Sequence, residues 1–140
     1  IQMPLTLSYT YTDARFLSNF NSSFEDWGNV NYGDELPYLS KHQLNTSISV
    51  EIKKVDLNLN AKYNSPMRAI AGQGNIDENS LIPSYFTVDA SANYKVNKNI
   101  SVFASVTNLT NQIYIVSSRP AGLRPGMPRA IQIGLKAAIN

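Results

Sequence analysis

Three arginines carry the clearest potential for binding chemistry in this sequence: Arg68, Arg119 and Arg124. A guanidinium group stays charged, and its fork of N–H donors matches a carboxylate or a phosphate group. All three lie in stretches without a regular hydrophobic pattern, which we expect to be loops. The sequence therefore predicts that they contact an anionic ligand; the simpler alternative is that they meet only water.

Other chemistries find little support in the residue types. His42 is the only histidine and cysteine is absent, so no metal site with several nitrogen or sulfur ligands is expected. We expect His42 to have a structural role at the start of a strand. No nucleophile–base pairing, glycine-rich phosphate loop or acidic pair at catalytic spacing is present, so we predict neither an enzyme nor a cofactor. The net charge of +2 and the scattered Lys and Arg argue against a nucleic-acid partner.

The elements that hold these side chains should be strands. Tyr, Phe, Val, Ile and Thr are frequent, whereas the Ala-Leu-Glu-Lys mixture of helical proteins is not. No stretch approaches the roughly 18 apolar residues of a membrane-spanning helix, and no signal segment opens the chain. Because the chain begins inside a strand-like pattern at Ile1, we expect it to be a piece of a larger protein.

Six segments alternate strictly between apolar and polar side chains, as half-buried strands do. The segments cover residues 5–12, 43–52, 55–64, 86–96, 100–107 and 131–139. Most approach the roughly 9–11 residues that a tilted strand needs to cross a bilayer. The charges inside them all fall on the polar face: Glu51, Asp56, Lys62, Asp89, Lys95 and Lys136.

The connections between these segments alternate in length. Residues 53–54 and 97–99 make two tight turns, whereas residues 13–41, 65–84 and 108–128 make three long links. Short turns at one rim and long loops at the other are typical of outer-membrane β-barrels. The pattern predicts an all-β, antiparallel, up-and-down meander of about six strands, with the long links outside the cell.

Aromatic side chains support this orientation, because amphipathic rings favour the two membrane–water boundaries. Tyr9, Tyr11 and Tyr63 fall near the loop ends of their segments, and Phe86 starts another segment there. Tyr94 falls near a turn end. The alternative is a soluble extracellular β-sandwich with a binding or adhesion role, which also alternates. Links of 20 or so residues are uncommon in such compact domains.

Two motifs in the last third resemble TonB-dependent outer-membrane receptors. After the Asp-bearing segment 86–94, residues 106–114 match a "V-x-N-L-x-[ND]-x-x-Y" strand end, and residues 125–129 match "P-G-x-P-R". Residues 9–16 and 36–42 are similar to the same family's strand-and-loop pattern, most of all in receptors of the ferric-citrate type. The family often ends in Phe or Trp, whereas this chain ends at Asn140, with Ile139 as its last apolar residue.

The resemblance implies that residues 1–140 are the C-terminal portion of a transmembrane barrel of about 22 strands. A plug domain and the earlier strands would lie outside this sequence. Such a receptor sits in the bacterial outer membrane, where it meets lipid and lipopolysaccharide. The TonB complex displaces the plug so that a ferric siderophore or similar iron chelate, cobalamin or a glycan is imported; we expect an iron chelate.

The resemblance also gives the candidate residues their expected roles. Arg68, Arg119 and Arg124 would bind an anionic iron chelate, or else meet lipopolysaccharide phosphates. Asp89, Lys62 and Lys95 would face the lumen. Asp89 would contact the plug or a substrate path; the simpler alternative is a wall residue that pairs with Lys62 or Lys95 or is hydrated.

The motif residues have a simpler expected role. Asn108 and Asn111 should end a strand through side-chain to backbone hydrogen bonds. Gly126 and its neighbouring prolines should shape the return into the last strand.

Overall fold

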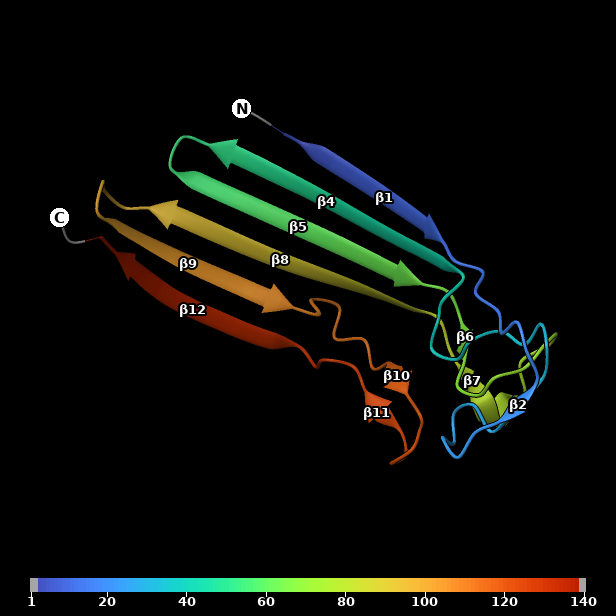
Figure 1. Ribbon diagram of the computed structural model, residues 1–140. Helices are drawn as coiled ribbons and strands as arrows, with labels where there is room; N and C mark the ends of the chain where they lie inside the picture. The colour runs from blue at the N-terminus through green and yellow to red at the C-terminus, as the bar shows by residue number, and fades with distance from the viewer. Residues whose placement is uncertain (1–2, 139–140) are drawn as a thin grey trace.

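The computed structural model describes residues 3–138 and contains one large antiparallel sheet (Figure 1). The six strands follow one another in chain order across the sheet. They are β1 (Leu5–Tyr11), β4 (His42–Ile52), β5 (Val55–Asn64), β8 (Tyr85–Lys95), β9 (Ile100–Thr107) and β12 (Ala130–Ala137). The predicted all-β meander is therefore confirmed, and its long links all emerge at one end of the sheet.

The long links contain short elements that the hydrophobic pattern did not predict. They are β2 (Phe20–Asn21), β3 (Asn29–Val30), β6 (Met67–Arg68), the 3₁₀ turn η1 (Glu78–Ser80), β7 (Leu81–Ile82), β10 (Ile115–Ser117) and β11 (Arg124–Pro125). A strand of two or three residues is too short to show a period of two. These strands pair as three small hairpins, β2 with β3, β6 with β7, and β10 with β11.

The register of the large sheet places most apolar residues opposite apolar residues. Leu59, for example, lies between Ile48 on β4 and Ala90 on β8. On the other face, Asn60 lies between Ser47 and Asp89. Because side chains of a strand alternate between faces, this register gathers every predicted apolar residue on one face and every strand charge on the other.

β5 and β9 have the predicted bounds, whereas β1, β4, β8 and β12 differ from the predicted bounds by one or two residues at one end or both. β8 begins at Tyr85, because Tyr85 still pairs with Asn64, and it ends at Lys95. β12 ends at Ala137, and the predicted extension to Ile139 lies outside the described residues. β1 and β12 each have a sheet neighbour on one side only, so each presents an unpaired edge.

The buried core lies among the long links and not on the sheet. Val30, Met67, Ala69 and Ile82 are buried there, whereas Ile133 on the apolar face of the sheet is 77% exposed. Within residues 3–138, no second large sheet covers that apolar face. The described residues thus form one large sheet and not the two packed sheets of the β-sandwich alternative. In the same residues, no helix is long and apolar enough to cross a membrane.

Candidate functional site

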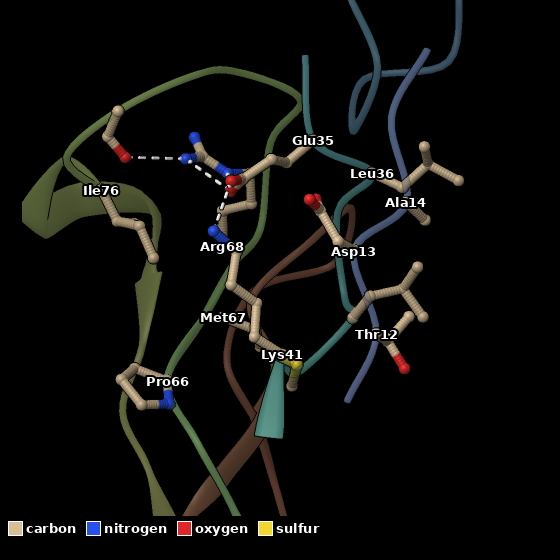
Figure 2. Close-up of a pocket in the computed structure, with 12 residues that line it drawn as sticks. Thr12, Asp13, Ala14, Glu35, Leu36, Lys41, Pro66, Met67, Arg68 and Ile76 are labelled. Atoms are coloured by element: carbon tan, nitrogen blue, oxygen red, sulfur yellow. Dashed lines mark hydrogen bonds and ion pairs between the residues drawn. The ribbon is translucent and has the colours of Figure 1, made fainter. Parts of the chain in front are cut away.

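The loop end of the sheet holds a group of charges around Glu35 (Figure 2). The Glu35 carboxylate lies 2.6 Å from Lys41 Nζ, 3.0 Å from Arg68 Nη2 and 3.5 Å from Arg15 Nη2. Arg68 also donates to Gly74 O at 3.0 Å. We refer to Glu35 with Arg15, Lys41 and Arg68 as the Glu35 clamp, because it joins the first long link to the second.

Backbone hydrogen bonds place the clamp. Glu35 N donates to Gly72 O, and Tyr38 N donates to Arg68 O, so the two links pair locally like strands. A Cβ atom at Gly72 would lie 2.9 Å from Arg68 Nη1, so a larger residue there would push the guanidinium aside. Glycine at this position therefore leaves room for Arg68.

Electrostatics favour the charged form of Glu35. Burial raises the pKa of its carboxyl, but hydrogen bonds from Lys41 and Arg68 lower it by more, and the net pKa lies below the ordinary value of 4.5. Arg68 is 6% exposed, so Glu35 supplies the counter-charge that its buried guanidinium needs. The clamp is thus a half-buried ion-pair network, which holds its geometry better than a single surface pair.

The cavity beside the clamp is small. It has a volume of about 110 Å³ and is bordered by Thr12, Leu36, Pro66 and Ile76 among others. Small-molecule sites usually enclose about 300–1,000 Å³. The cavity is therefore too small to hold a chelate by itself, and we interpret the clamp as the part that fixes the two links against each other.

The tip of the first link carries four aromatic rings in edge-to-face contact. Phe16, Phe20 and Trp27 lie 5.4–6.0 Å apart between ring centroids, and Phe24 lies 5.7 Å from Trp27. Such pairs stabilise beyond the area that they bury. They give this link an aromatic cluster of its own, which the sequence analysis did not predict. Spacings of four, four and three residues are typical of one helix face, but no helix forms between residues 16 and 27.

The three candidate arginines occupy two different places. Arg119 and Arg124 lie in the third link, where Arg124 pairs in register with Ser117 of the β10–β11 hairpin. Neither is part of an ion pair among residues 3–138. Arg68 lies in β6 with its guanidinium engaged by Glu35. The structure shows no direct interaction of Arg68 with the other two in the described part of the chain.

The first family-like motif ends β9 through one buried amide. Asn108 is fully buried at φ 51°, donates from Nδ2 to the carbonyls of Gln112 and Met127, and accepts from Gln112 N. Its own backbone N–H donates to Asp89. The predicted strand-ending role of Asn108 is confirmed, and the same side chain also holds the return toward β12.

The second motif packs on the first. Tyr114 stacks on Tyr85 with 4.6 Å between ring centroids, and its ring lies over Gly126. A Cβ atom at Gly126 would overlap that ring, so only glycine fits. Gly126 N donates to Tyr114 O, which fixes the two segments in register. These spacings are therefore structural requirements.

The three predicted wall residues lie on the polar face of the sheet. The Asp89 carboxylate accepts a hydrogen bond from the backbone N–H of Asn108, at 2.8 Å, and it pairs with no lysine among residues 3–138. Lys95 pairs instead with Asp56 at 3.3 Å and with Glu51 at 3.6 Å, near the tight turns. Lys62 and Asp89 border the same shallow depression, with no ion pair between them in residues 3–138.

His42 and the remaining acids form no metal centre. His42 Nδ1 lies 2.8 Å from the Tyr9 hydroxyl, and its ring packs near Tyr11. Within the described residues no group of three or more His, Cys, Asp or Glu side chains converges. Sequence reasoning missed Glu35, Lys41 and Arg15, since they belong to one site only after the two links pack together.

A comparison with protein families identifies the family of this chain. The model of the TonB dependent receptor-like β-barrel matches residues 2–109 of the 140. The chain belongs to the TonB-dependent receptor β-barrel family. The family-level prediction is confirmed, and the six strands are part of such a barrel. The proteins of this family are transporters and receptors of the bacterial outer membrane.

Solved structures share this fold. The sheet and its links are similar to the ferric-catecholate import receptor Fiu from E. coli K12, with a TM-score of 0.73 and 22% identity over 96% of this chain and 18% of that one. For the siderophore receptor PiuA from Acinetobacter baumannii the TM-score is 0.75 and the identity 20%, over 96% of this chain and 19% of that one. For the ferric citrate transporter FecA the TM-score is 0.67 and the identity 20%, over 96% of this chain and 21% of that one. The chain thus spans about a fifth of these receptor barrel proteins.

Proposed function

We propose that this chain is the C-terminal part of the barrel of an outer-membrane active transporter that imports a ferric siderophore or similar iron chelate. The observation that carries the proposal is the two-faced sheet, with an uncharged apolar face, a polar face and long links at one end only. Family membership and the import receptors among similar structures support it.

In this proposal the apolar face meets lipid and the polar face lines the lumen. Backbone groups in a bilayer need partners within the protein, so β1 and β12 would pair with barrel strands outside this sequence. A plug domain, also outside it, would occupy the lumen and contact the TonB complex. The Asp89, Lys62 and Lys95 side chains would face that plug or the substrate path.

Arg119 and Arg124 are the residues that we assign to capture of an anionic chelate. They lie at the loop end and lack carboxylate partners in the described residues, so their N–H donors can bind carboxylate or phosphate oxygens. We keep Arg68 as a secondary candidate, because a ligand reaches its guanidinium only by displacing Glu35. Lipopolysaccharide phosphates are the competing partner of all three.

The first test asks whether the full-length protein is an outer-membrane barrel. It should extract from outer-membrane preparations only with detergent and should migrate faster on a gel before boiling than after. A soluble monomer without detergent would overturn the proposal.

The second test asks what is imported. A deletion strain should fail to grow on one ferric chelate as sole iron source and recover with the wild-type gene. Arg119→Gln with Arg124→Gln should weaken rescue at limiting chelate, whereas Arg129→Gln, next to the start of β12, should rescue fully. Growth unaffected on every iron chelate would remove the iron-import proposal.

A further inference from the structure

The apolar face of the sheet is not evenly filled. A hollow of about 460 Å³ lies over β4, β5, β8 and β9. Its floor contains Ala90, Ala92 and Ala104, and the register places Ala92 directly beside Ala104. Leu57 and Leu59 border it on one side, and Ile133, opposite Ala104, stands on the other.

Positively charged side chains lie at the turn end of the sheet, below this hollow. The two tight turns adjoin, since Lys95 N donates to Lys54 O and Lys54 Nζ donates to Val96 O. The first turn carries Lys53 and Lys54, both exposed, and neither pairs with a carboxylate among residues 3–138. Lys98 of the second turn instead lines a depression on the polar face with Lys95 and Lys136. The acids of that end, Glu51 and Asp56, are engaged by Lys95 on the polar face.

We propose that this hollow and the turn of Lys53 and Lys54 together bind one anionic phospholipid of the periplasmic leaflet, with an acyl chain over the alanines and the phosphate at that turn. The inference rests on the proposed function, in which the apolar face meets a bilayer. No protein partner is needed, because hydrocarbon and phosphate match the two parts of the site.

The distances agree with one lipid molecule. Ala92 lies five residues from Asn97 in the turn, which is about 17 Å along a strand and about 12 Å of membrane depth at a tilt near 45°. One leaflet contributes about 15 Å of hydrocarbon. A phosphate held at the turns therefore leaves its acyl chain long enough to cover the alanines.

Two further features favour lipid over a second copy of the chain. Tyr94, 49% exposed, lies on the same face between the hollow and the turns, where a phenol suits the headgroup boundary. Two copies packed through this face in one membrane would set their lysine turns at the same depth and repel each other. An anionic lipid is attracted by the same charges.

The test uses the full-length protein extracted in detergent and exchanged into bilayers of phosphatidylglycerol or phosphatidylcholine. Native mass spectrometry then counts retained lipid. Wild-type protein should retain phosphatidylglycerol in preference. Lys53→Gln with Lys54→Gln should weaken retention about twenty-fivefold, since each lysine beside an anionic lipid changes binding roughly fivefold. Lys136→Gln, on the polar face, is the matched control and should leave retention unchanged.

A second variant pair addresses the hollow. Ala92→Leu with Ala104→Leu should abolish retention, whereas Ala137→Leu adds one leucine to the same face outside the hollow and should not. Faster gel migration before boiling confirms that each variant is folded. Equal retention of both lipids in a folded wild-type barrel, or retention unchanged by both variant pairs, would overturn this inference and leave the proposed function intact. A copurifying second copy in place of lipid would also overturn it. A soluble protein would instead overturn the proposed function.

Discussion

Asn108 shows how much one side chain does at the end of β9. Its amide satisfies the Gln112 N–H and the carbonyls of Gln112 and Met127, and no solvent reaches it. A buried polar group that loses its partner costs about 1–3 kcal/mol. The backbone of Asn108 is also in the left-handed region, which asparagine tolerates better than most residues.

Asn108→Ala should therefore destabilise the barrel by about 3 kcal/mol, because it leaves these backbone groups without hydrogen-bond partners. The folded gel band of the full-length protein should disappear at a lower temperature. Asn111→Ala is the matched control, since Asn111 is also left-handed but exposed. It should cost about 1 kcal/mol. Equal effects of the two substitutions would contradict the account of the buried amide.

Glu35 gives the long links a dependence on pH. Its pKa is lowered in the folded protein, so the folded state binds fewer protons than the unfolded state near pH 4.5. The clamp's contribution to stability is therefore fully present above that pH and is lost as the pH falls through the lowered pKa. Hydrogen exchange of residues 31–41 and 66–74, corrected for intrinsic rates, should show this loss of protection.

Glu35→Gln should remove that pH dependence and reduce the local protection about a hundredfold at neutral pH, because Arg68 then lacks a counter-charge. Glu51→Gln removes the same charge from the turn end and should leave these peptides unchanged. Protection that is equal in wild type and Glu35→Gln would show that the clamp does not hold the links.

At the scale of the element, the hairpin of β9 and β12 is held by an aromatic ring on the polar face. Phe103 pairs in register with Gly134, and its ring covers the glycine, so a Cβ atom there would overlap it. A ring over a glycine shields a backbone that has no side chain of its own. This contact fixes the register of the edge strand β12.

Gly134→Val should therefore cost about 2 kcal/mol by displacing the ring. Phe103→Ala should recover part of that loss in the double variant, although alone it also destabilises. The unfolding temperatures of the two single variants and the double variant, read from gel migration, form a double-mutant cycle that measures the coupling between Phe103 and Gly134. Strictly additive effects would show that ring and glycine do not interact.

At the scale of the whole molecule, the sheet has no core of its own. Leu7, Ile131 and Leu135 remain at least 65% exposed on the apolar face, and β1 and β12 have unpaired edges. Such a surface is stable in lipid within a closed barrel and adhesive in water. The stability of this chain thus depends on its surroundings.

The 140 residues produced alone should therefore aggregate or associate in detergent-free buffer. Size-exclusion chromatography with light scattering should find no monomer. Co-expression with the rest of the barrel should restore a species with faster gel migration before boiling. A stable water-soluble monomer of the isolated chain would contradict this expectation.

The sequence by itself determined the sheet. Strict alternation placed Leu57 and Leu59 on one face and Asp56 and Lys62 on the other, since a strand has a period of two and a one-residue slip would bury every charge. The alternation of short and long links determined the meander and its rims. The motif around Asn108 indicated the family by resemblance, and the family model confirms that membership.

The tertiary structure alone decided the site at the loop end. Glu35, Arg68 and Lys41 come from two links with no common period, so nothing local indicates that their charges meet. Only the packing of these links shows that Arg68 is engaged while Arg119 and Arg124 are not. The alanine hollow likewise arises from register across four strands, because the size of a side chain there matters only once its neighbours on the other strands are known.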